Sequence, residues 1–165
     1  MASPVGATHR APGASVIGSA SGTAARKSIP ASSPLHADAP LTIHGVVSLA
    51  GINDLKAYRD KGPDACGGPP TIDALTGASS RTGQPVYADT SPAEMLPLGT
   101  PIAVLSGALD HIVPPPFGDA FGAAARLRGD MVVVRTFPGA GHFELIDPSS
   151  AAWPDIVAEI DRLAR

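Results

Sequence analysis

The chain has 165 residues, which suffices for one domain with a single hydrophobic core but not for a large multilayer enzyme. Its formal net charge of -3, without a basic stripe, argues against nucleic acid or an anionic membrane as a partner. The single cysteine, Cys66, excludes an internal disulfide, and no Cys/His cluster has the spacing of metal ligands.

The first part of the chain, residues 1–40, is dominated by Ala, Ser, Gly, Pro and Thr, and Val16-Ile17 is its only adjacent aliphatic pair. Such a segment cannot bury enough apolar surface to offset ~1–2 kcal/mol of backbone entropy per ordered residue. We therefore predict that residues 1–40 are disordered, or alternatively that they are a non-native segment translated from a shifted reading frame before about Lys27. The ordered domain is expected to span residues 41–165.

No apolar run in the sequence approaches the ~18 residues of a membrane span. The N-terminus also lacks a signal-peptide core, because Gly, Ser, Pro and Thr interrupt residues 1–29 throughout. These features predict a cytoplasmic protein that does not bind a membrane.

The first predicted strand is the apolar part of HGVVSLAG, residues 44–51, which Ala50-Gly51 closes. After it, Asn53 or Asp54 is a candidate N-cap of a short helix with Leu55 and Tyr58 on one face.

A second short helix is predicted between two Gly/Pro-rich loops. Thr71 is its candidate N-cap, Gly77 its end, and Ile72 and Leu75 are expected to point inward. A single helical turn is predicted in AEMLP, residues 93–97.

In the second half, the runs Ile102–Ser106 and Met131–Phe137 are typical of buried strands of a parallel sheet. Amphipathic helices are predicted over Pro116–Arg128 and from Ser149 or Ser150 to Arg165. Alternating strands and helices imply right-handed crossovers and a parallel sheet. The predicted fold class is α/β, with about three parallel strands and flanking helices.

Asp110 and His142 follow the ends of the two later strands, at the sheet edge where ligands bind in open α/β proteins. Asp110 has two interpretations: a carboxylate that accepts a hydrogen bond from an imidazole, or a loop aspartate that caps the next turn. His142 lies in PGAGHFE, where two glycines leave the imidazole uncrowded, as suits a general base, although a surface-turn histidine is the alternative.

Other ionisable residues near these loops are assigned no chemistry. His111 is expected to be a loop residue, and Glu144 and Asp147 to be loop and helix-cap residues ahead of Pro148. Cys66 lies in a Gly/Pro loop without a neighbouring base, so a nucleophilic role is not expected.

From about Ile43 to the C-terminus, the chain resembles the C-terminal half of an α/β-hydrolase, and more narrowly the esterase, lipase and prolyl-oligopeptidase-like members. The matching motifs are GVVSLAGINDL, TSPAEMLPLGTPIAVLSGALDHIVPP and PGAGHFELIDP. By this resemblance Asp110 is the acid and His142 the general base of a Ser-His-Asp serine hydrolase. The resemblance implies a small-molecule ester or peptide substrate and no cofactor or metal.

The nucleophile elbow of that family, G-x-S-x-G, does not occur in this sequence, and neither does an H-G-G-like oxyanion turn. The nearest approach is Gly18–Gly22, whose middle residue is Ala20, so Ser19 or Ser21 is the candidate remnant nucleophile.

Three hypotheses follow from the missing elbow. The chain is a truncated or inactive serine hydrolase, an active esterase that uses Ser19 or Ser21, or a non-catalytic module whose open sheet edge pairs with a partner chain.

Overall fold

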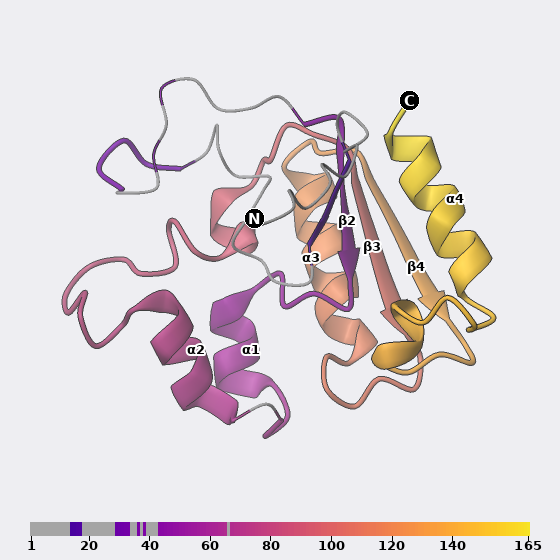
Figure 1. The fold of residues 1–165 in the computed structure, drawn as a ribbon. Helices are drawn as coiled ribbons and strands as arrows, with labels where there is room; N and C mark the ends of the chain where they lie inside the picture. Colours follow the sequence, from indigo (N-terminus) through magenta and orange to yellow (C-terminus); the bar gives the residue numbers. More distant parts are fainter. Residues whose placement is uncertain (1–13, 18–28, 34–35, 37, 39–42, 66) are drawn as a thin grey trace, which may run out of the picture.

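The computed structural model describes residues 14–17, 29–33, 36, 38, 43–65 and 67–165. Within them, one sheet has the strand order β1-β2-β3-β4, and all three strand pairs are parallel. The strands are β1 (Ala14–Ile17), β2 (Gly45–Leu49), β3 (Ile102–Gly107) and β4 (Val132–Phe137). Figure 1 shows the sheet at the centre of the molecule, with the arrowheads of its labelled strands pointing to one edge.

Two helices cover the faces of this sheet, α3 (Pro115–Leu127) and α4 (Trp153–Leu163) (Figure 1). Side chains alternate along β3, so that Ile102 and Val104 pack with Phe121 and Ala125 of α3. The intervening residues pack in a second cluster with α4, whose members include Ala103, Leu105, Ile156 and Leu163. Every residue of β2 and β3 is buried, as expected for parallel strands with both faces covered. The predicted parallel α/β fold is confirmed.

Two short helices, α1 (Leu55–Lys61) and α2 (Gly68–Thr76), lie beside each other beyond the end of β2 (Figure 1). The side chain of Asp54, one of the two predicted N-caps, accepts a hydrogen bond from the backbone N–H of Ala57 at 2.9 Å. Leu55 and Tyr58 are the buried residues of α1, which confirms the predicted inward face.

The prediction for α2 was partly wrong. The helix begins at Gly68, before Thr71, because prolines occupy its first turn, where a backbone N–H has no partner within the helix. Ile72 is buried as predicted, but the side chain of Leu75 is 50% exposed. The single turn predicted in residues 93–97 is the 3-10 helix η2 (Pro92–Met95).

The helices of the second half differ from the prediction mainly at their ends. Helix α3 ends before Gly129, whose φ of +93° suits glycine. Helix α4 begins at Trp153, later than Ser149 or Ser150, because those serines belong to a separate turn that starts at Asp147. None of the helices in the described ranges has the length and apolar character needed to cross a membrane.

Strand β1 is an addition to the predicted sheet. It lies within residues 1–40 and pairs with β2 from Ala14 opposite Gly45 to Ile17 opposite Ser48. Backbone groups along the edge of β2 need hydrogen-bond partners, and a short segment can supply them without a run of β-branched residues. Most of residues 1–40, with Ser19 and Ser21, and also Cys66, lie outside the described residues.

A buried ion pair holds residues 29–33 against the loop that precedes η2. Asp89 is 4% exposed and accepts two hydrogen bonds from the guanidinium of Arg81, both at 2.9 Å. Its carboxylate also accepts a hydrogen bond from Ser33 Oγ at 2.7 Å. Burial acts to raise the pKa of Asp89, but the hydrogen bonds from Arg81 and Ser33 outweigh it and hold the pKa below its ordinary value.

Asp89→Asn is expected to lower the free energy of unfolding by about 1–3 kcal/mol at pH 7, because the variant lacks the carboxylate that Arg81 and Ser33 hold. The folded-state pKa lies below the ordinary 3.8, so this contribution is complete above that pH and is lost as the pH falls through the folded-state pKa. Urea unfolding followed by Trp153 fluorescence should therefore show a difference that shrinks below pH 3.8. The control is Asp161→Asn at an exposed position of α4, which is expected to change the free energy of unfolding by less than about 0.5 kcal/mol. A difference for Asp89→Asn that does not depend on pH would contradict the argument.

Candidate active site

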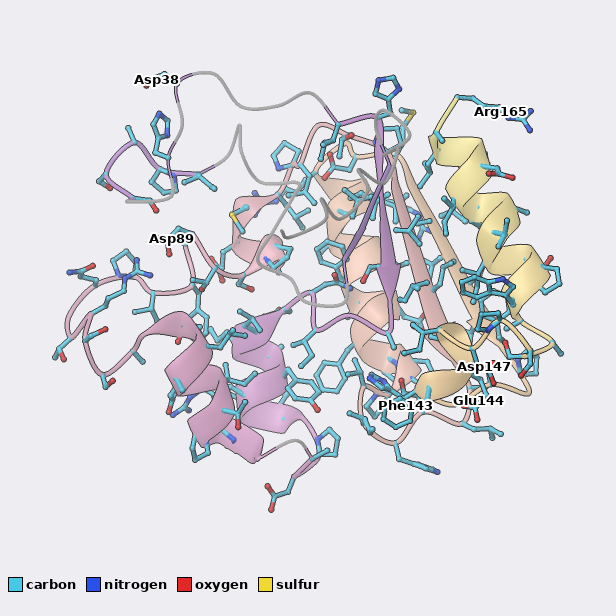
Figure 2. All side chains as sticks on the ribbon, in the orientation of Figure 1. Asp38, Asp89, Phe143, Glu144, Asp147 and Arg165 are labelled. Atoms are coloured by element: carbon cyan, nitrogen blue, oxygen red, sulfur yellow. The ribbon has the colours of Figure 1, made fainter. Side chains whose placement is uncertain are left out.

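The C-terminal edge of the sheet carries the two residues that sequence analysis selected. Asp110 follows β3 and His142 follows β4, and these two strands are neighbours in the sheet. Figure 2 shows Phe143, Glu144 and Asp147 near one another at this edge, whereas Arg165 lies at the opposite end of the molecule. Ligands of open α/β sheets bind at this edge, so it is the candidate site.

Asp110 and His142 are directly hydrogen-bonded, with 2.8 Å between the Nδ1 atom of His142 and the Oδ2 atom of Asp110. The carboxylate side chain is 0% exposed and the imidazole side chain is 27% exposed. An ionised carboxylate only accepts hydrogen bonds, so Nδ1 carries the proton in this contact, and in the neutral form of the ring the Nε2 atom is the one with a lone pair. The pair thus presents a basic nitrogen on a partly exposed ring, fixed from behind by a buried acid.

The second carboxylate oxygen of Asp110 is held by its own loop. Its Oδ1 atom accepts hydrogen bonds from the backbone N–H groups of Ile112 and Val113, both at 2.8 Å. Both contacts that the sequence suggested for Asp110 are therefore present, because one carboxylate oxygen caps the turn while the other contacts the imidazole. Three N–H groups compensate the desolvated charge and fix the plane of the carboxylate.

The two loops meet because their backbones are bonded to each other. The N–H of Leu109 donates to the carbonyl of Ala140 at 2.9 Å, and the N–H of Ala108 donates to that of Phe137 at 2.9 Å. Gly107 lies at the closest approach: a Cβ atom there would press on the carbonyl oxygens of Ala140 and Gly141. A glycine at the end of β3 is thus required for the aspartate and histidine loops to touch.

Other ionisable residues near the site have roles in loop structure. Glu144 accepts a hydrogen bond from the N–H of Gly141 at 2.9 Å, and His111 is an exposed loop residue. Asp147 accepts hydrogen bonds from the N–H and hydroxyl of Ser149, which lower the pKa of Asp147. Asp147 lies in a loop as predicted, although it caps its own turn and not α4, whereas Glu144 belongs to the 3-10 helix η3 (Phe143–Leu145) and not to a loop.

Sequence analysis did not identify the exposed apolar side chains in the segments that carry Asp110 and His142, one of which contacts the imidazole. Leu109 is 58% exposed, Phe143 65% and Ile146 62%, and the ring of Phe143 meets that of His142 edge-on, 5.2 Å between centroids. Large apolar side chains next to Asp110 and His142 in the sequence were a visible signal, but their exposure depends on the tertiary fold. Phe143 gives the surface beside His142 an apolar character.

Within the described part of the chain, no three His, Cys, Asp or Glu side chains come together so that they could hold a metal ion.

Gly107→Ala is expected to lower the free energy of unfolding by about 1–3 kcal/mol, because the added methyl displaces the backbone at Ala140 and Gly141. Chemical unfolding measures this effect. The matched control is Gly139→Ala, in the loop that contains Ala140 and Gly141, where an added Cβ meets nothing within 4 Å. This control should change the free energy of unfolding by less than about 0.5 kcal/mol. Equal losses in the two variants would show that the close approach at Gly107 is not what limits substitution.

Comparison with known proteins finds likeness in structure only. No protein-family model matches the sequence. No curated protein matches it either. Esterase 2 of Thermogutta terrifontis with propionate bound superposes with a TM-score of 0.57 at 19% identity, over 84% of this chain and 49% of that chain. Puromycin hydrolase superposes with a TM-score of 0.54 at 21% identity, over 74% of this chain and 18% of that chain.

Acylaminoacyl peptidase of Pyrococcus horikoshii superposes with a TM-score of 0.53 at 16% identity, over 74% of this chain and 20% of that chain. The chain therefore spans about half the length of the esterase and about a fifth of the other two proteins. All three are α/β-hydrolases, and at these identities the likeness concerns the fold. The parallel sheet with its flanking helices is thus part of an α/β-hydrolase fold, as the sequence motifs predicted.

Proposed function

We propose that Asp110 and His142 are the acid and the general base of a serine-hydrolase site for small ester or peptide substrates. We further propose that this chain by itself is an incomplete, inactive form of that site, because it lacks a competent nucleophile. The observation that carries the proposal is the 2.8 Å hydrogen bond between a fully buried carboxylate and a partly exposed imidazole.

The proposed chemistry is acyl transfer to water. The Nε2 atom of His142 takes the proton of a serine hydroxyl as the oxygen attacks the substrate carbonyl, and it returns the proton to the leaving group. An acyl-enzyme forms, and His142 then activates water in the same way. Asp110 keeps the imidazole in the productive tautomer and stabilises the imidazolium that arises in each step.

The hydrogen bonds of the described serines argue against a nucleophile among them. None of their hydroxyls is hydrogen-bonded to His142, and those nearest in sequence have other partners. Ser149 donates to Asp147 at 2.8 Å, and Ser150 donates to the carbonyl of Glu144 at 2.6 Å. Together with the missing G-x-S-x-G motif and oxyanion turn, this supports an inactive site.

The substrate class rests on the structural neighbours and on the surface beside the imidazole. Esterase 2 of Thermogutta terrifontis has been solved with propionate and with butyrate, which are short acyl groups. The exposed ring of Phe143 meets the imidazole edge-on and provides apolar surface beside the base that suits such a group. Short-chain esters are therefore the first substrates to test.

An active enzyme with Ser19 or Ser21 is an alternative that one feature of the sheet favours. Strand β1 ends at Ile17, next to β2 and parallel to it, so its C-terminal end lies at the edge of the sheet where Asp110 and His142 also lie. A nucleophile elbow also follows a strand at this edge.

A role in pairing with a partner chain is the other candidate, and the sheet order favours it. Within the described residues, β1 pairs only with β2, so its outer edge has backbone groups available for another strand. Sedimentation velocity of the purified chain tests this role: self-association or capture of a complementary hydrolase segment supports it, and a stable, well-dispersed monomer contradicts it.

The purified chain is expected to hydrolyse p-nitrophenyl butyrate no faster than its His142→Ala variant, because a base without a nucleophile gives no acyl-enzyme. A fluorophosphonate probe followed by intact mass analysis is expected to show no adduct. An adduct on Ser19 or Ser21, with turnover that His142→Ala abolishes, would instead support the active enzyme.

A test of the roles proposed for Asp110 and His142 requires an active protein that contains them. A chimera in which residues 43–165 replace the matching part of Thermogutta terrifontis esterase 2 supplies the other half of the fold. Its esterase activity is expected to fall by a factor on the order of 10⁴ on Asp110→Asn or His142→Gln, with the melting temperature as a control for folding. A folded chimera whose activity survives either substitution would refute the assignment.

A further inference from the structure

We propose that Tyr58 is a positioning residue for the Asp110–His142 pair, which it stabilises by fixing the backbone of the aspartate loop. This proposal rests on the proposed function, because it concerns the same acid and base. The proposed action of Tyr58 runs through the carbonyl of Ile112, to which its hydroxyl donates a hydrogen bond.

The contact of Tyr58 spans two distant parts of the chain. Its hydroxyl, on α1, donates a hydrogen bond to the carbonyl of Ile112 at 2.6 Å, across 54 residues of sequence. The residue is 4% exposed, and its ring lies 5.3 Å from that of Phe117 in the first turns of α3. Because α1 is packed into the core, it gives the hydroxyl a fixed place from which to hold the loop.

Ile112 connects this hydroxyl to the acid. Its carbonyl accepts from Tyr58, while its N–H and that of Val113 donate to the Oδ1 atom of Asp110. The same short segment is thus held on one side by tyrosine and holds the carboxylate on the other. When the hydroxyl is removed, the carbonyl of Ile112 loses its donor, and the segment gains freedom to shift. A shift changes the direction of both N–H groups and turns the Oδ2 atom away from the imidazole.

Packing alone does not account for a tyrosine at this position. A phenylalanine would fill the same buried space beside Phe117 and would keep the apolar face of α1 that Leu55 and residue 58 form. The hydroxyl adds the hydrogen bond to the carbonyl of Ile112, which phenylalanine cannot make. Replacement by phenylalanine therefore separates a positioning role from a role in packing.

The side chain that reports on this role is the imidazole. Asp110 is the charged group bonded to its Nδ1 atom, and the nearby carboxylate of Glu144 is engaged by the N–H of Gly141. His111, the other ionisable side chain in the aspartate loop, is exposed. The fraction of neutral imidazole with the proton on Nδ1 therefore measures how well Asp110 is aimed.

The test uses the full chain with ¹⁵N-labelled histidine, and NMR measures the tautomer of His142 and the exchange rate of its Nδ1–H with water. In Tyr58→Phe, exchange is expected to be about tenfold faster, with a detectable Nε2–H tautomer. The matched control is Tyr87→Phe, at the only other tyrosine of the chain, and it should leave both quantities unchanged. Parent-like tautomer and exchange in Tyr58→Phe would overturn the proposal.

A second measurement keeps the test decisive if Tyr58→Phe folds poorly. In the Tyr87→Phe background, 3-fluorotyrosine labels Tyr58 alone, and Asp110→Asn is expected to shift the ¹⁹F resonance because the two residues share Ile112. An unchanged resonance would overturn the role of Tyr58. Asp110→Asn should also abolish the Nδ1–H tautomer of His142; if it does not, the acid–base pair and the proposed function fail, whatever Tyr58 does.

Discussion

The parallel pairing of β3 with β4 is the interaction on which the candidate site depends. The two strands are in register from Ile102 opposite Val132 to Gly107 opposite Phe137, so they end together at one edge of the sheet. Each continues into a short loop, and the hydrogen bond from Leu109 to Ala140 joins these loops. The distance between acid and base is therefore set by strand register. A slip by one residue would turn every side chain of the strand to the other face and separate the pair.

Burial of Asp110 strengthens the effect of its charge on the imidazole, but it also requires hydrogen bonds that replace the hydration of the carboxylate. Removing a carboxylate from water costs several kcal/mol unless hydrogen bonds replace its hydration. Here two backbone N–H groups and one imidazole N–H do so. Each of these donors has a fixed position, and the carbonyl of the same segment is bonded to Tyr58, so the carboxylate has little freedom to rotate. In this low-dielectric surrounding the charge acts strongly on the imidazole, which is what a general base needs when it takes up a proton.

Much of the fold and part of the site could be predicted from sequence, for physical reasons. Buried parallel strands are continuous apolar runs, so β2, β3 and β4 were visible, and Asp110 and His142 stood out because each followed such a run. Strand β1 was missed because its pairing depends on the edge of β2 more than on its own residues. Leu75 was predicted to point inward in a helix that was assumed to start after Thr71, but the helix begins at Gly68 and Leu75 is half exposed. The bond from Tyr58 to Ile112 joins residues far apart in sequence, and no local pattern signals it.

The pair of Asp110 and His142 forms independently of much of the chain, because the contacts that hold it come from a small part of the fold. They involve β3, β4, their two loops and one tyrosine of α1, all within residues 43–165. The pair can thus be fully formed while the nucleophile and the oxyanion donors, which belong to other strands in this type of fold, are not. Since the members of a triad act as a unit, a preformed acid and base contribute little to the rate until a serine is placed within reach of the Nε2 atom of His142.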